Sequence, residues 1–182
     1  GMGLFGVEAD MEGFERGRKL GKVGRKAQDT AELFLEDVAV PAENVIGELG
    51  KGLNHLMSNL PQERLSMAVT GVAAAERALR ITLDYCRDRN AFGKPIGSFQ
   101  ANRFALADLH TEIQVARAYT DTCIAAHAEG ELTAVEAASA KLWVTELQGR
   151  VMDRCVQLHG GYGYMEEYEI SRMWKDAPIG RA

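Results

Sequence analysis

Apolar side chains recur at spacings of three and four residues between Leu65 and Arg87, which is typical of one face of a long helix. The residues on that face are Leu65, Ala68, Val69, Val72, Ala75, Leu79, Thr82 and Leu83. The helical pattern starts near Leu53, and Pro61 interrupts its early turns. Because proline is tolerated without penalty only near a helix start, we expect Asn59 to cap the helix that carries this face.

Two further segments show the same helical spacing. Ser98 is a suitable N-cap for the first, which ends near Gly130. Its apolar stripe consists of Phe104, Leu106, Leu109, Ile113, Ala116, Thr120, Cys123 and Ile124. Thr133 and Glu136 have the spacing of a capping box at the start of the second. The apolar residues of that helix are Ala137, Leu142, Trp143, Leu147, Val151 and Val156.

A shorter helical stretch covers roughly residues 167–175, after the paired glycines Gly160 and Gly161. Three long helices and one short helix joined by short loops predict an antiparallel four-helix bundle. We therefore assign residues 51–182 to a mainly α domain.

The first 50 residues follow a different pattern. Short apolar or alternating runs at residues 4–8 and 31–40 predict strands, and a basic segment with several glycines lies between them. Two or three strands do not form a stable sheet alone. We therefore interpret residues 1–50 as a short β remnant of a larger β domain that continues before Gly1.

Composition and charge narrow the classes of function. The 182 residues are 46% hydrophobic and 26% charged, with a net charge of −5, so general nucleic-acid binding is not expected. No apolar run approaches the roughly 20 residues of a membrane span. The three cysteines form no disulfide framework, and the four histidines lack the spacing of metal ligands. We expect no metal and a reducing compartment. The first expectation is the bacterial cytoplasm, and the mitochondrial matrix applies if the source is eukaryotic.

A carboxylate and a guanidinium are adjacent in the stretch Pro61-Gln62-Glu63-Arg64. Glutamate is favoured in a first helical turn because it complements the helix dipole, and the pattern favours that interpretation of Glu63. Apolar neighbours in the sequence also allow partial burial, which raises a carboxylate pKa toward the range of a general base. Both alternatives remain open on the pattern alone.

Two other segments have residues suited to binding a ligand. Residues 87–95 combine three cations with Phe92 in a turn, which suits a phosphate and a planar ring, although a basic helix end followed by a loop is the simpler interpretation. Residues 157–164 contain Gly160 and Gly161 and a third glycine, which allow close backbone approach or a glycine turn after a helix. His159, in the same segment, is given no ligand role.

These three segments, in this order and spacing, resemble the acyl-CoA dehydrogenase family, most of all the C-terminal helical domain of its long-chain-type branch. The resemblance covers nearly the whole chain, and residues 29–41 look like the last strands of the family's central β domain. It implies an FAD enzyme that converts an acyl-CoA thioester to the trans-2-enoyl-CoA. Electrons then pass to an electron-transfer flavoprotein. The family's N-terminal helical domain lies outside these residues.

The resemblance also implies roles for single residues. Long-chain and isovaleryl-type branches place the α-proton base at the position of Glu63, with Pro61, Gln62 and Arg64 beside the substrate. Other branches place it in a loop after the last helix, beyond Ala182. The FAD contacts implied by the family motifs fall on Arg89, Phe92, Gln100, Gln157, Gly160 and Gly161. Because the family's cofactor bridges two subunits, a homodimer or homotetramer is expected.

The sequence leaves three alternative functions open. The first is an acyl-CoA dehydrogenase with Glu63 as the base. The second is a helical oligomerisation fragment that is inactive and binds no cofactor. The third is an acyl-CoA oxidase-like flavoenzyme, which also removes an α-proton; a monooxygenase would need no such base.

Overall fold

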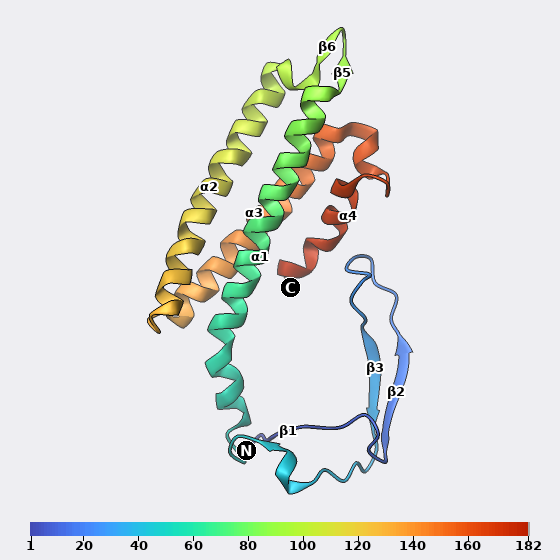
Figure 1. The fold of residues 1–182 in the computed structure, drawn as a ribbon, viewed down its shortest axis with the longest axis vertical. Helices are drawn as coiled ribbons and strands as arrows, with labels where there is room; N and C mark the ends of the chain where they lie inside the picture. Colours follow the sequence, from blue (N-terminus) through green and yellow to red (C-terminus); the bar gives the residue numbers. More distant parts are fainter. Residues whose placement is uncertain (182) are drawn as a thin grey trace. The chain divides into compact units, whose positions relative to one another are not determined.

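The computed structural model describes residues 1–181, which divide into two compact units, Gly1–Leu60 and the residues from Pro61 onward (Figure 1). The first unit contains four short strands. Strand β1 (Leu4–Phe5) pairs antiparallel with β4 (Val45–Ile46), and β2 (Phe14–Lys19) pairs antiparallel with β3 (Ala31–Leu35). A 3-10 turn, η1 (Ala42–Asn44), precedes β4.

The two strand pairs of the first unit share no buried core. The strand expected over residues 31–40 ends at Leu35, and Asp37 has a φ of 47° in the turn that follows. Leu33, Phe34 and Leu35 all have exposed side chains. Two-stranded sheets of this kind have only marginal stability unless another element packs against one face. These strands therefore present apolar side chains that the unit does not cover.

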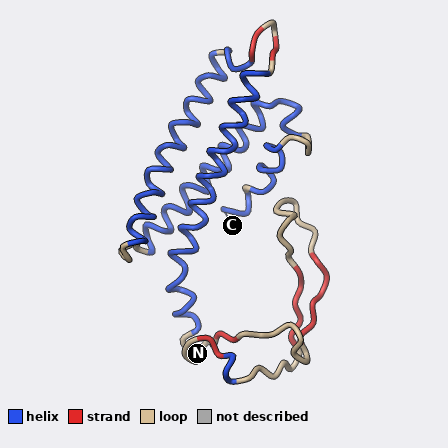
Figure 2. Tube along the Cα trace, in the orientation of Figure 1, coloured by secondary structure: helices blue, strands red, loops and turns tan. Residues whose placement is uncertain are grey.

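The second unit is a bundle of helices (Figure 2). Its main elements are α1 (Gly52–Asp88), which begins in the first unit, α2 (Gln100–Ala128), α3 (Ala134–His159) and α4 (Glu169–Asp176). The hairpin of β5 (Asn90–Ala91) and β6 (Lys94–Pro95) and the turn η2 (Ile96–Ser98) connect α1 to α2. The turn η3 (Gly160–Tyr164) follows α3, and η4 (Pro178–Arg181) follows α4. The predicted mainly α bundle is confirmed.

The start of α1 differs from the prediction. The helix begins at Gly52, and Pro61 lies inside it, so Asn59 is not its cap. The His55 N–H already donates to the Lys51 carbonyl at 3.1 Å. A proline inside a helix removes one backbone hydrogen bond and bends the axis, and here the flanking turns continue on both sides of it. Glu63 consequently lies about three turns inside the helix and is not a first-turn glutamate.

The core of the bundle follows the predicted face of α1. Its buried positions are Leu65, Ala68, Val72, Ala75, Ala78, Leu79, Thr82 and Cys86. On α2 the predicted stripe is also buried, apart from Phe104 and Ile124, which are exposed. On α3 the prediction is wrong for Leu142 and Trp143, whose side chains are 65% and 47% exposed. Val144, Met152 and Cys155 are buried instead, because the helix turns a slightly different face to α1 and α2.

Polar contacts fix the helix ends and join the helices. The capping box at α3 is confirmed, since the Thr133 N–H donates to Glu136 at 2.9 Å and the Glu136 N–H donates to the Thr133 hydroxyl at 3.2 Å. The expected cap at Ser98 is wrong. Its hydroxyl donates to the Pro95 carbonyl at 2.7 Å, and Phe99 holds the cap position of α2 without a side-chain bond.

Two bidentate ion pairs also cross between helices. Arg77 on α1 pairs with Glu169 on α4 at 2.8 and 2.6 Å. Arg117 on α2 pairs with Glu76 on α1 at 2.9 and 2.6 Å. Paired N–H donors of this kind set the relative position of the two helices they join. Within residues 1–181, no helix combines the length and hydropathy required to cross a membrane.

Candidate cofactor pocket and candidate base

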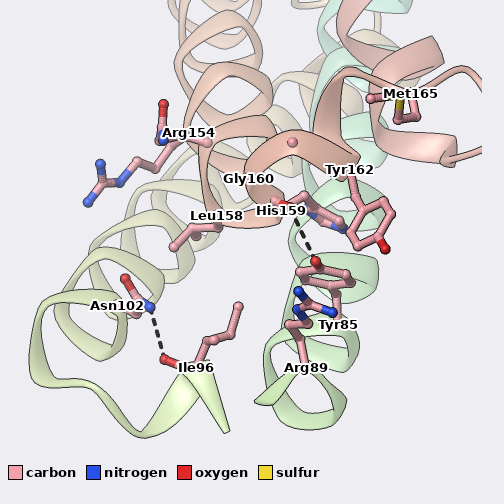
Figure 3. Close-up of a pocket in the computed structure, with 12 residues that line it drawn as sticks. Tyr85, Arg89, Ile96, Asn102, Arg154, Leu158, His159, Gly160, Tyr162 and Met165 are labelled. Carbon is pink, nitrogen blue, oxygen red and sulfur yellow. Dashed lines mark hydrogen bonds between the residues drawn. The ribbon is translucent and has the colours of Figure 1, made fainter. Parts of the chain in front are cut away.

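A pocket of about 620 Å³ lies at one end of the bundle (Figure 3). Its walls come from the end of α1, the start of α2, the end of α3 and the turn η3. Four of the residues predicted to bind FAD, Arg89, Gln157, Gly160 and Gly161, are in its lining. The chain topology thus brings together two motifs that are almost 70 positions apart in the sequence.

Arg89 lies one position beyond the last residue of α1, and its side chain is exposed. Its guanidinium carbon lies 5.4 Å from the centre of the Tyr162 ring, within the range of a cation–π contact. No carboxylate within the described range, residues 1–181, forms an ion pair with it. Arg89 therefore brings a positive charge to the pocket, and no carboxylate of residues 1–181 pairs with it.

Four rings pack together beside Arg89, and we call Tyr85, His159, Tyr162 and Tyr168 the aromatic cluster. The Tyr85 and His159 rings are stacked, with centroids 4.2 Å apart and planes at 20°. Tyr168 meets both of them edge-on at 6.2 and 6.3 Å, and it stacks with Tyr162 at 5.0 Å and 27°. The Tyr85 hydroxyl donates to the His159 carbonyl at 3.2 Å. The cluster joins α1 to the segment between α3 and α4.

Burial sets the protonation of two members of the aromatic cluster. His159 is buried, which lowers its pKa, although a hydrogen bond between Nδ1 and the Cys155 carbonyl at 2.9 Å opposes that shift. Desolvation raises the pKa of Tyr85, and the nearby charge of Arg89 opposes that rise. Both rings are consequently neutral near pH 7, and Arg89 carries the positive charge of this group.

The three glycines after α3 have different physical roles. Gly160 has a φ of 59° and a ψ of −140°, a conformation that side chains disfavour. A Cβ on Gly163 would lie 2.3 Å from the Val156 carbonyl oxygen, so only glycine fits that approach to α3. Gly161 has no such neighbour within 4 Å and lies in the pocket wall. It therefore leaves a stretch of backbone open to a ligand.

Phe92 and Gln100 lie outside this pocket. Phe92 and Gly93 have φ values of 53° and 81° at the tip of the β5–β6 hairpin, the pattern of a type I′ turn. The Phe92 side chain is 95% exposed and meets Phe99 edge-on at 6.3 Å. Gln100 is the exposed first residue of α2. These two predicted contacts face away from the chain and would need a ligand or a second subunit beside the hairpin.

The candidate base lies far from the pocket. Glu63 and the end of α1 are separated by roughly seven turns, or about 38 Å of helix axis. Glu63 and Gln62 are exposed, and Pro61 and Arg64 are half-buried. The partial burial expected for Glu63 is not found within this chain, because Leu65 turns to the core while the Glu63 side chain points to solvent. One chain therefore carries two separate candidate sites.

Sequence patterns did not identify several residues that shape the pocket. Tyr85 lies one helical turn before Arg89, a spacing that could have indicated contact. Arg154 and Asn102 also line the pocket, and the Asn102 side chain donates to the Ile96 carbonyl at 2.9 Å. Tyr162 lies within the glycine segment, residues 157–164, but the sequence predicted no role for it. Its contact with Arg89 depends on the return of the chain after α3, which no local pattern indicates.

The pocket suits part of a ligand with an anionic group and a flat ring system. Arg89 offers N–H donors to phosphate, Gly161 gives access to backbone, and the rings of Tyr85 and His159 supply flat surface in the pocket wall. The volume falls within the usual range for small-molecule sites, about 300–1,000 Å³. The residues present therefore fit the phosphate-bearing part of a dinucleotide such as FAD.

Comparison with known proteins places these features in a family. Residues 50–182 match the family model for the C-terminal domain of acyl-CoA dehydrogenases. A mitochondrial long-chain specific acyl-CoA dehydrogenase from Sus scrofa is 49% identical over 98% of this chain. The chain spans only 42% of that protein's length.

Solved structures show the same similarity. An acyl-CoA dehydrogenase from Geobacillus kaustophilus superposes with a TM-score of 0.96 at 49% identity, covering 98% of this chain and 47% of that one. An acyl-CoA dehydrogenase complexed with FAD, from Bacillus anthracis, has a TM-score of 0.93 at 32% identity, covering 97% of this chain and 34% of that one.

Proposed function

The chain belongs to the acyl-CoA dehydrogenase family, and we propose that it is the C-terminal part of an FAD-dependent enzyme that α,β-dehydrogenates acyl-CoA thioesters. Residues 1–50 then belong to the central β domain and residues 51–182 to the helical domain. The observation that carries this proposal is the pocket that gathers Arg89, Gln157, Gly160 and Gly161 in a chain of this family.

We assign the phosphate-bearing part of FAD to this pocket. Arg89 would donate to the pyrophosphate, which explains why a guanidinium without a carboxylate partner lies there. Gln157 and the backbone at Gly160 and Gly161 would lie along the adenosine part. Phe92 would meet the cofactor from the exposed hairpin tip, and Gln100 from the first turn of α2.

Glu63 is the proposed α-proton base, with Pro61, Gln62 and Arg64 beside the thioester. The position of Glu63 within a Pro-Gln-Glu-Arg sequence and the 49% identity with a long-chain specific relative support this assignment. A thioester α-proton is weakly acidic, so the carboxylate must be withdrawn from water and the carbonyl oxygen must receive hydrogen bonds. Because Glu63 is exposed here, substrate and cofactor would have to cover it.

FAD, when bound, supplies the acceptor for the hydride that leaves the β-carbon. The chain's own task is to position the acyl group and to hold the α-proton after Glu63 removes it. Electrons would then pass to an electron-transfer flavoprotein. The similarity to a long-chain specific enzyme leads us to propose a long-chain acyl-CoA as the substrate.

The experiment uses the full-length protein, including any residues that adjoin this chain. It should purify with a flavin spectrum, and an acyl-CoA should bleach that spectrum without oxygen. Glu63→Gln keeps the size of the side chain but removes the base, so the bleaching rate should fall by at least about 100-fold, the lower range for general-base catalysis, while FAD stays bound. The matched control is Glu129→Gln, at another exposed glutamate, which should bleach at the unmodified rate.

Three results would contradict the proposal in different ways. A colourless protein that FAD does not reconstitute would favour a helical module without cofactor. Rapid bleaching by the Glu63→Gln variant would exclude Glu63 as the base. Fast reoxidation of the reduced protein by oxygen, with no transfer to an electron-transfer flavoprotein, would instead indicate an acyl-CoA oxidase.

A further inference from the structure

The backbone on both sides of Arg89 is fixed, but its side chain has one visible support. The Arg89 N–H donates to the Tyr85 carbonyl at 2.8 Å, and the Arg89 carbonyl accepts from the Ile96 N–H at 2.8 Å. The long side chain still has several rotatable bonds, and ordering it has an entropic cost. Its guanidinium meets the Tyr162 ring and, within residues 1–181, no carboxylate.

Tyr162 is itself held in place. It stacks with Tyr168, which packs edge-on against the stacked pair Tyr85 and His159. The Tyr85 hydroxyl also donates to the His159 carbonyl, and the His159 side chain is buried. Arg89 is thus supported through Tyr162 by the aromatic cluster. Figure 3 shows Arg89, Tyr85, His159 and Tyr162 on one side of the pocket.

An aromatic face and a carboxylate support a guanidinium in different ways. A carboxylate would take up the N–H donors and neutralise the charge, whereas a ring contacts the flat face and leaves the donors at the edge free. The arrangement around Arg89 therefore holds the cation in one orientation and keeps its charge available for an anion.

We propose that Tyr162 is a positioning residue that orients Arg89 toward the pyrophosphate of FAD without contacting the cofactor chemically. This inference rests on the proposed function, because it takes the ligand of the pocket to be FAD. It adds a role for Tyr162, which is not among the proposed FAD contacts.

The main test measures the dissociation constant of FAD for variants of the full-length protein. Tyr162→Leu removes the ring, and FAD should bind about 3- to 10-fold more weakly, the range expected for loss of one cation–π contact. Tyr162→Phe keeps the ring face and should bind within about 2-fold of the unmodified protein. The control Tyr164→Leu changes an exposed tyrosine of the same turn η3 and should have no effect.

A double-mutant cycle separates positioning from direct contact. If Tyr162 acts through Arg89, Tyr162→Leu should change FAD binding by less than about 2-fold once Arg89 is replaced by leucine. An unchanged loss in that background would mean that Tyr162 touches the ligand itself, and it would overturn the positioning role.

Arg89→Lys tests the same contact from the other side and does not depend on the folding of a Tyr162 variant. Lysine keeps the charge but lacks the flat guanidinium, so FAD should again bind at least about 3-fold more weakly. Full affinity with lysine would overturn the proposal. If Arg89→Leu itself leaves FAD binding unchanged, the pocket assignment fails. If Arg89→Leu weakens binding but Tyr162→Leu does not, only the positioning role fails.

Discussion

His159 shows how burial decides the state of a single side chain. Its imidazole lies between the Tyr85 ring and the backbone of α3, and its Nδ1 bonds to the Cys155 carbonyl at 2.9 Å. Desolvation lowers its pKa from the ordinary value of 6.5. As the pH falls through 6.5, the unfolded state takes up a proton on this histidine more readily than the native state does. The free energy of unfolding therefore decreases as the pH falls through that value.

The corresponding prediction concerns stability between pH 7.5 and 5.5. Over this window His159 should account for a loss of at most about 1.4 kcal/mol in the free energy of unfolding, the limit for one proton taken up by the unfolded state alone. Urea denaturation at the two pH values measures it. His159→Asn keeps an N–H donor but does not titrate, so its pH-dependent loss should be smaller.

The matched control is His110→Asn, because His110 is exposed on α2. That variant should show the same loss as the unmodified protein. An unchanged loss in His159→Asn would contradict the proposed link between burial of His159 and stability.

Among the helices, α3 shows how local chemistry sets one end and packing sets the face. Thr133 and Glu136 bond reciprocally at its start. The Thr133 hydroxyl and N–H both donate to the Glu136 carboxylate, and these two bonds lower the pKa of Glu136. The pattern of two residues was enough to predict this start. The buried face of α3 did not follow from the pattern, because Leu142 and Trp143 are apolar and yet exposed. Which apolar residues are buried depends on where α1 and α2 lie.

Removal of the cap should be measurable. Thr133→Ala leaves the Glu136 N–H of the first turn without its side-chain acceptor, so the free energy of unfolding should fall by about 1 kcal/mol. Thr122→Ala is the control, because the exposed Thr122 hydroxyl bonds only to the Ala118 carbonyl of its own helix. Its effect should stay within about 0.5 kcal/mol. Equal effects of the two variants in urea denaturation would mean that the capping box contributes no stability.

At the scale of the whole molecule, the separation of Glu63 from Arg89 matters most. About 38 Å of α1 lies between them, which is more than one small-molecule site can span. Apolar side chains such as Phe34, Leu142 and Trp143 are exposed on the isolated chain, and exposed apolar surface marks interaction sites. Both observations favour an assembly in which Glu63 of one subunit and Arg89 of another serve the same active site.

Complementation between two inactive variants tests this arrangement. Glu63→Gln lacks the base and Arg89→Leu lacks the proposed phosphate contact, so each alone should be nearly inactive. In a randomly mixed homodimer, roughly a quarter of all sites would pair an intact Glu63 with an intact Arg89. Unfolding and refolding the two variants together should therefore restore about a quarter of the bleaching activity.

Refolding each variant separately before mixing provides the control and should restore little. If co-refolding restores no activity although mixed oligomers form, both residues would belong to the same subunit's site. That result would contradict the shared-site arrangement. The roles of Glu63 and Arg89 would still be tested by the single variants.

Patterns repeated along the chain were sufficient for the helical bundle and for the residues that suggest its chemistry. The core face of α1 from Leu65 to Thr82 follows from spacing alone, because a helix places positions three and four apart on one side. The capping box at Thr133 follows from chemistry within one turn. The resemblance that led to Glu63, Arg89 and Gly160 likewise depends on the order and spacing of three short segments along the sequence.

Tertiary packing decided the features that join distant segments. It determines that Val144 and not Trp143 is buried in the core. It also places Tyr162 against Arg89 and puts Glu63 at the other end of the helix. These outcomes depend on free energies summed over contacts between segments, such as burial and ring stacking, and a local pattern contains only the contacts within its own few turns.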